Sequence, residues 1–127
     1  MKIKFIDHIV IIVKDTKISE NFYNKFLGTP GHVYADSISY KIGDTKIFFG
    51  LSYGEWQSND KDKSGLNHLA FGVRTMGELK EVEIVLNSSD IKNSGIIKEK
   101  DSKKDFIWCD DPDGHRLEFY LRPESNK

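Results

Sequence analysis

The sequence is poor in cysteine, which limits the kinds of site and of covalent stabilisation that it can have. Of its 127 residues only Cys109 is a cysteine. No disulfide can form within the chain, and a metal site rich in cysteine thiolates is excluded. We expect Cys109 to be a buried apolar side chain and not a nucleophile, because no nearby base is recognisable in the sequence.

Long hydrophobic runs are missing as well. The longest apolar stretch, Ile9–Val13, is far shorter than the roughly 20 residues that cross a bilayer. The first residues, Met1–Phe5, lead directly into this stretch, and no small-residue cleavage site of the kind found in signal peptides follows. We therefore expect no membrane partner and a cytoplasmic location.

Charge of one sign is not in excess either. The chain has 19 Lys and Arg against 20 Asp and Glu, for a net charge of −1 at pH 7. Such a balance produces no large field that would favour nucleic acid. The runs Asn59–Lys63 and Lys98–Lys104 mix both signs and are typical of solvated loops. The alternative is that Lys98 or a neighbour reaches over a pocket and holds an anionic ligand.

The same order of predicted elements occurs twice along what we expect to be a single domain over residues 1–127. In the first module, residues 4–52, a strand near 5–13 precedes a helix and three short strands near 32–35, 38–42 and 45–51. In the second, residues 65–122, a strand near 67–73 precedes a helix and three strands near 95–98, 106–109 and 115–121. The class is therefore α+β with two βαβββ modules. Two curved mixed sheets of this kind can cover each other and leave a cup for a small ligand between them.

Two histidines occupy matching places in these modules. His8 and His68 both lie in the first predicted strand, in Asp7-His8-Ile9 and Asn67-His68-Leu69. Side chains alternate along a strand, and the residues opposite each histidine are bulky, so those faces should pack on the helices. The faces that carry the histidines are then predicted to line the cup.

Glu118 completes a candidate metal site. It lies in the last predicted strand, between Leu117 and Phe119, where a carboxylate is costly to bury unless it is paired. Two imidazoles and one carboxylate from three strands can form a facial triad with open coordination positions. We predict that His8, His68 and Glu118 bind one divalent metal ion, with iron, manganese, zinc and nickel among the candidates.

Four segments make the chain resemble the vicinal oxygen chelate superfamily, the proteins of the glyoxalase, bleomycin-resistance and extradiol-dioxygenase families. They are Asp7–Asp15, Asn21–Gly28, Asn67–Phe71 and Asp111–Glu118. The resemblance implies a glyoxalase-like fold and places the family's ligand positions on His8, His68 and Glu118. Short two-module members commonly pair, so it also implies a homodimer in which His8 of one subunit joins His68 and Glu118 of the other.

Departures from the family pattern bear on the reaction. Lactoylglutathione lyases add a fourth ligand, whose place Phe48 takes here, and Phe can neither bind metal nor accept a proton. The site more closely resembles the three-ligand fosfomycin-resistance thiol transferases and the extradiol dioxygenases. Lys98 and Ser102 fall at the anion-binding positions of those transferases, while Val10 and Trp108 replace their Thr and Tyr.

The residues and the resemblance together favour a metal-dependent enzyme that chelates a small oxygen-bearing substrate, by thiol-transferase-like, dioxygenase-like or lyase-like chemistry. Phe48, Lys98, Trp108 and Tyr120 are the predicted substrate contacts. Two alternatives stay open. One is a metal-free drug-binding protein of the bleomycin-resistance type, and the other is a metal-binding module without turnover.

Overall fold

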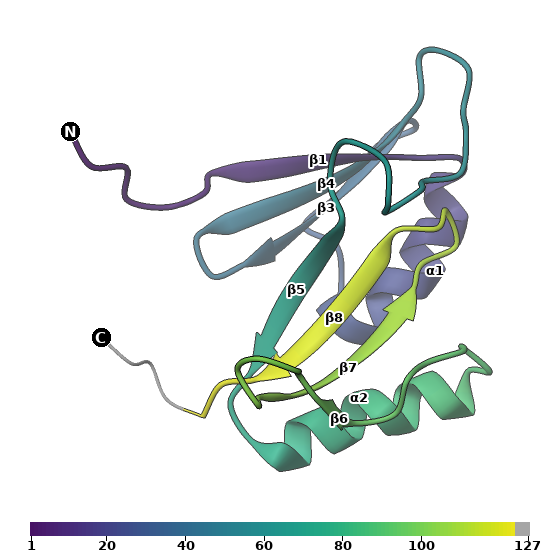
Figure 1. Ribbon diagram of the computed structural model, residues 1–127. Coiled ribbons are helices and arrows are strands. Elements are labelled where there is room, and N and C mark those ends of the chain that lie inside the picture. Colours follow the sequence, from purple (N-terminus) through teal and green to yellow (C-terminus); the bar gives the residue numbers. More distant parts are fainter. Residues whose placement is uncertain (124–127) are drawn as a thin grey trace. The chain divides into compact units, whose positions relative to one another are not determined.

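Two units, residues 1–58 and the chain from Asn59 onward, make up the computed structural model, which describes residues 1–123. Each unit has one four-stranded sheet and one helix (Figure 1). The first contains β1 (His8–Val13), α1 (Thr16–Leu27), β2 (His32–Val33), β3 (Ser37–Ile42) and β4 (Thr45–Leu51). The second contains β5 (His68–Val73), α2 (Met76–Ser88), β6 (Ile97–Lys98), β7 (Asp105–Asp110) and β8 (Arg116–Leu121). The predicted α+β class with two βαβββ modules is confirmed.

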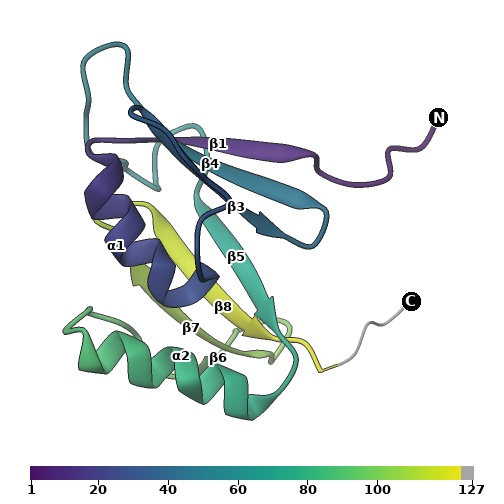
Figure 2. The ribbon, with the colours of Figure 1, turned by 180° about the vertical axis from the view of Figure 1, so that it is seen from behind.

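Both sheets have the same strand order, with the first strand of the unit beside the last. The orders are β1-β4-β3-β2 and β5-β8-β7-β6, and Figure 2 shows the same arrangement from behind. The β1–β4 and β5–β8 pairs are parallel, and the other pairs are antiparallel. A parallel pair needs a long crossover connection, which the helix and the two intervening strands supply here. This topology places the histidine-bearing strand β5 directly against β8.

Residues that favour helix ends stand at both ends of helix α1. The Asp15 carboxylate accepts hydrogen bonds from the backbone N–H groups of Lys17 and Ile18, at 2.8 and 3.3 Å. These bonds satisfy amides that the first turn of a helix leaves without partners. At the other end Gly28 has a φ of +77°, in the region that favours glycine.

The buried face of α1 differs in part from the expected one. Its apolar spacing suggests a stripe through Ile18, Phe22 and Phe26, joined by Tyr23 and Leu27, but Ile18 is 53% exposed. The helix buries Phe22 and Tyr23 as expected, together with Thr16 and Ser19, and the Tyr23 ring stacks on that of Phe49 in β4 at 4.1 Å. An aromatic stack of this kind buries more surface than a single Ile, and its geometry fixes the rotation of the helix.

Helix α2 is fixed by a capping box. The Thr75 hydroxyl accepts from the Glu78 N–H, and the Glu78 carboxylate accepts from the Thr75 N–H. Leu79 and Leu86 are the fully buried residues of this helix.

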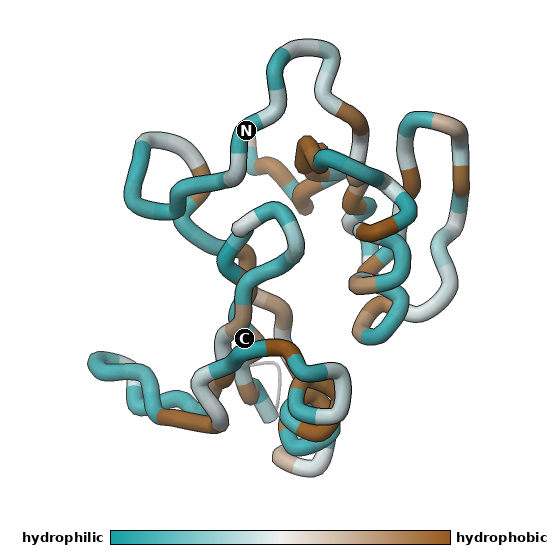
Figure 3. Tube along the Cα trace, turned by 90° about the vertical axis from the view of Figure 1, so that its right-hand side faces the viewer, coloured by the Kyte–Doolittle hydropathy of each residue, from teal (hydrophilic) through white to brown (hydrophobic). Residues whose placement is uncertain are grey.

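No helix in the described part of the chain is long and apolar enough to span a membrane. Figure 3 shows short hydrophobic and hydrophilic segments interspersed along the trace.

Several strands are shorter than predicted. The first begins at His8 and not at Phe5, although the carbonyl of Asp7 still accepts a hydrogen bond from the N–H of Lys46 at 3.0 Å. The outer strands β2 and β6 have two residues each. They pair on one side only. The neighbouring strand determines where each of them ends, and the local sequence does not specify these ends.

Candidate functional site

The sheet of the second unit has one open face, and His68 lies on it. In β5, His68, Ala70 and Gly72 are exposed, whereas the three alternate residues are partly covered. Register places Arg116, Glu118 and Tyr120 of β8 directly beside those three exposed residues. The small Ala70 and Gly72 leave room above the sheet.

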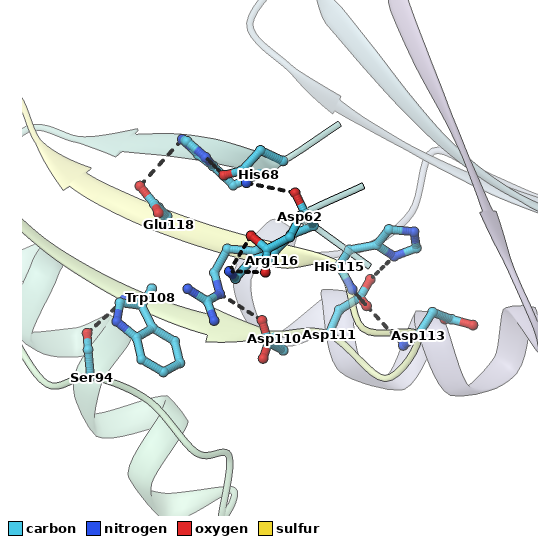
Figure 4. Close-up of polar contacts among 12 residues, drawn as sticks. Asp62, His68, Ser94, Trp108, Asp110, Asp111, Asp113, His115, Arg116 and Glu118 are labelled. Atoms are coloured by element: carbon cyan, nitrogen blue, oxygen red, sulfur yellow. Dashed lines mark hydrogen bonds and ion pairs between the residues drawn. The ribbon is translucent and has the colours of Figure 1, made fainter. Parts of the chain in front are cut away.

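His68 and Glu118 approach each other on this face (Figure 4). His68 Nε2 and Glu118 Oε1 are 3.5 Å apart, and the Glu118 side chain is only 13% exposed. The ring is oriented by Asn67, whose Oδ1 lies 2.8 Å from His68 Nδ1. The Asn67 amide is itself fixed, since its Nδ2 donates to the carbonyl of Lys61 at 2.8 Å.

This chain of hydrogen bonds determines which ring nitrogen is available. An amide oxygen can only accept, so His68 Nδ1 carries the proton of the neutral ring. The Nε2 lone pair therefore points at the Glu118 carboxylate, and two acceptors face each other. A cation between them, either a proton or a metal ion, would satisfy both. Orientation of a ligating histidine through its other nitrogen is a common feature of metal sites.

Tyr120 holds the carboxylate from the other side. Its hydroxyl donates to Glu118 Oε1 at 2.9 Å, and its ring stacks on that of Phe106 at 4.7 Å. Burial, followed by the hydrogen bond to Glu118 and the charges of Glu118 and Glu99, raises the pKa of Tyr120 to about 12. The phenol thus remains a neutral hydrogen-bond donor at physiological pH.

In the first unit His8 repeats the local arrangement of His68. Its Nδ1 lies 2.8 Å from a carboxylate oxygen of Asp7, the preceding residue, and this leaves Nε2 available. The His8 ring meets the Phe48 ring edge-on at 5.6 Å. Phe48 is therefore on the same face as His8, as the sequence predicts.

Trp108 lies on the open face of the second unit, but another side chain covers its ring. It is directly opposite Glu118 in the β7–β8 pair. The Arg116 guanidinium sits over its indole at 3.9 Å and also donates to Asp110 at 2.8 Å, as Figure 4 shows. Arg116 is not among the site residues predicted from the sequence, although its position two residues before Glu118 places it on the same face of β8.

The structure does not bring Lys98 to His68 and Glu118. Its Nζ donates to Asp105 at 3.0 Å, and the two residues are register partners across β6 and β7. Asp105 alternates with Phe106, whose partner in β8 is Tyr120. Lys98 is therefore on the face of the sheet opposite to Glu118. Its predicted contact with substrate stays a prediction without support from this placement.

A cavity of about 360 Å³ opens beside His68 in the second unit. Its lining includes His68 and Tyr120 together with Ser102, Lys104 and Arg122. Lys104 and Arg122 were not recognised from the sequence. The first belongs to a mixed-charge run typical of solvated loops, and the second follows the last strand.

A second group of potential ligands builds the turn before β8. Ligand atoms of Asp111, Asp113 and His115 lie within 4.8 Å of one another. The Asp111 carboxylate accepts from the N–H groups of Asp113 and His115 and lies 2.9 Å from His115 Nδ1. His115 directly precedes β8, and its side chain is only 13% exposed.

The environment of His115 also affects its protonation. Burial by itself opposes the charged ring, but the hydrogen bond to Asp111 and the charges of Asp111 and Asp113 outweigh it. The pKa of His115 is consequently raised above its usual value of 6.5. The cluster of Asp111, Asp113 and His115 therefore has a structural role, because its hydrogen bonds hold the turn before β8.

Comparisons with known proteins agree with the fold. The family model for the glyoxalase, bleomycin resistance protein and dioxygenase superfamily matches residues 5–119. The uncharacterised protein YaeR of Escherichia coli (strain K12) is 28% identical, over 93% of this chain and 96% of its own length. The structure of a candidate glyoxalase from Bacillus halodurans is similar with a TM-score of 0.81, at 22% identity, over 92% of this chain and 95% of that one. A lactoylglutathione lyase from Agrobacterium tumefaciens shares the fold with a TM-score of 0.75, at 13% identity, over 97% of both chains. The chain belongs to the glyoxalase, bleomycin resistance protein and dioxygenase superfamily.

Proposed function

We propose that this protein is a metal-dependent enzyme acting on a small oxygen-bearing substrate, with His8, His68 and Glu118 binding one divalent ion. The observation that carries the proposal is the pair of acceptors, His68 Nε2 and Glu118 Oε1, that face each other at 3.5 Å. Two ligands about 2.0–2.2 Å from one ion lie roughly 3.0–3.5 Å apart in octahedral or tetrahedral geometry. The pair therefore fits a metal ion without rearrangement of the sheet.

His8 is the proposed third ligand. Its Nδ1 is held by Asp7 as that of His68 is held by Asn67, so both rings keep Nε2 for a metal. The two modules would then act as one domain of a homodimer, in which His8 of one subunit completes the site of the other.

Mixing of two inactive variants tests this arrangement. The His8→Ala and His68→Ala variants each lack one ligand, but a mixed dimer with shared sites contains one intact triad. Metal capacity should reappear after the two variants are mixed and allowed to exchange subunits. No recovery in a dimer with verified exchange would show that the three ligands come from one chain.

A bound divalent ion would act as a Lewis acid that chelates neighbouring substrate oxygens and stabilises developing negative charge. Residues of the chain itself would support this chemistry. Tyr120 donates to Glu118 at 2.9 Å and so limits rotation of the carboxylate. Phe48, Trp108 and Tyr120 are proposed to line the substrate site. Lys98 would have to leave its partner Asp105 and turn from the opposite face of the sheet in order to join them.

The reaction class can be tested with purified, metal-loaded protein. We expect turnover in a panel that combines thiols with epoxides and includes catechols and 2-oxoaldehydes. Isomerisation of 2-oxoaldehyde adducts is the least expected outcome, because Phe48 leaves no carboxylate at the equivalent place in the first sheet. Metal binding without any turnover would favour a non-catalytic metal-binding module. Failure to bind any divalent ion would instead favour a metal-free drug-binding protein.

A further inference from the structure

We propose that the cavity beside His68 is a subsite for an oxyanion, so that the substrate carries a carboxylate, phosphate or phosphonate group in addition to its metal-chelating oxygens. This inference rests on the proposed metal site and specifies its substrate class. Lys104 and Arg122 are the residues that would bind the oxyanion and determine specificity.

The cavity and the candidate metal ligands share one face of the second unit. His68 and Tyr120 line the cavity together with Lys104 and Arg122, and Tyr120 is hydrogen-bonded to Glu118. A ligand in the cavity is therefore adjacent to the pair that would hold the metal. Its volume of about 360 Å³ is at the small end of the usual range for ligand pockets, which suits a small metabolite.

Lys104 and Arg122 differ from the other cations near this sheet. Arg116 stacks on Trp108 and forms an ion pair with Asp110, and Lys98 forms an ion pair with Asp105. Within residues 1–123, no carboxylate lies at ion-pair distance from Lys104 Nζ or from the Arg122 guanidinium. These two charged groups thus have donors available for a ligand.

The loop that carries Lys104 is ordered by its own hydrogen bonds. The Glu99 N–H donates to the Lys104 carbonyl at 2.8 Å, and the Lys103 N–H donates to the Glu99 carbonyl at 2.9 Å. The Glu99 carboxylate accepts from the N–H groups of Asp101 and Ser102 at 3.1 and 2.7 Å. The loop therefore presents Lys104 at the cavity without first having to fold around a ligand.

Glu99 is the acidic residue that also lines the cavity, and its negative charge would oppose the binding of an anion. Its pKa is lowered, first by the Ser102 backbone hydrogen bond and then by further bonds from Ser102 and Asp101. The ionised carboxylate is thus already engaged by the backbone of its own loop. With a divalent ion at Glu118, the charges of Lys104, Arg122 and the metal exceed those of the two carboxylates by two units, so the cavity favours an anion.

A matched set of chelators tests the proposal on the full-length protein. Acetohydroxamate, the mono-hydroxamate of succinate and 3-phosphonopropanohydroxamate share one metal-chelating head, and the last two add a carboxylate or a phosphonate. Calorimetry with the metal-loaded protein should show that one or both anionic compounds bind at least about tenfold more tightly than acetohydroxamate, as expected of a charge-assisted hydrogen bond. Comparison of the two anionic compounds shows which oxyanion the cavity prefers.

Variants assign this preference to the cavity. Lys104→Gln and Arg122→Gln should each reduce the preference for the anionic compounds several-fold and leave the affinity for acetohydroxamate and for the metal alone unchanged. Lys100→Gln is the matched control, because Lys100 lies in the same loop but does not line the cavity. It should behave as the original protein does.

The possible results separate the two proposals. Equal binding of all three hydroxamates by metal-loaded protein, or a preference that survives both substitutions, would overturn the oxyanion subsite while the metal site stands. Failure of the protein to bind divalent metal would overturn the proposed function itself, and calorimetry with metal alone detects that result before any hydroxamate is added.

Discussion

Phe48 and Glu118 occupy the same position in the two sheets. Each is paired in register with the residue two places after a histidine, Phe48 with Val10 and Glu118 with Ala70. The antiparallel neighbour on the other side is Ser39 for Phe48 and Trp108 for Glu118. The repeat thus supplies two equivalent places for a carboxylate, and the chain uses only the one on β8.

Phe48→Glu should create a fourth metal ligand. In the metal-free protein we expect destabilisation by about 1–3 kcal/mol, because a half-buried carboxylate replaces an apolar ring. Saturating divalent metal should restore more stability to this variant than to the original protein, since ligands that bind only the folded state stabilise it. Melting temperatures with and without metal check this. Phe48→Leu, which removes the ring without adding a ligand, should show no extra metal-dependent gain.

His68→Ala should remove metal binding and keep the fold. The loss of affinity should exceed the roughly 10–100-fold that removal of an outer hydrogen-bond partner costs. Stability without metal should change by no more than about 0.5 kcal/mol, since His68 is exposed. Metal titration and urea unfolding measure the two effects. His32→Ala is the control, because His32 is an exposed histidine that stacks on Tyr34. Equal metal affinity of both variants would contradict the proposed ligand set.

His115 should make stability depend on pH. Its pKa is raised above 6.5 in the folded protein. The contact of the charged ring with Asp111 therefore stabilises the fold fully at pH values below the pKa of His115 in the unfolded chain. This stabilisation is lost as the pH rises through the pKa of His115 in the folded protein. His115→Gln should therefore cost about 1–2 kcal/mol more at pH 5.5 than at pH 9. Urea unfolding at both values measures the difference, and a cost that grows with pH would have the wrong sign.

Cys109 should be unreactive in the native protein. The residue is fully buried in β7, and burial, together with the charges of Asp110 and Asp111, raises the pKa of its thiol to about 12. Almost no thiolate, the reactive form, exists near pH 8. Labelling with iodoacetamide should proceed at the rate of global unfolding and become complete in concentrated urea. Rapid labelling of the folded protein would show that β7 opens locally.

Local sequence determined the repeated order of elements and the likeness between the two modules. Alternation of apolar residues identified the strands, and Asp15 and Gly28 marked the ends of α1, because these signals act over a few residues. The same alternation placed His68 and Glu118 on one face of their strands. Recognition of the candidate site depended on the repeat, since a single histidine or glutamate in a strand carries little information.

Tertiary structure decided which side chains meet. The pairing of Lys98 with Asp105, the stacking of Arg116 on Trp108 and the place of Lys104 at the cavity depend on register between strands distant in sequence. The rotation of α1 depends in the same way on the stack of Tyr23 on Phe49. Periodicity gives the face of a strand or helix, but a register shift by one residue exchanges the two faces. Pairings of this kind are therefore set by the packing of the whole unit and not by the local sequence.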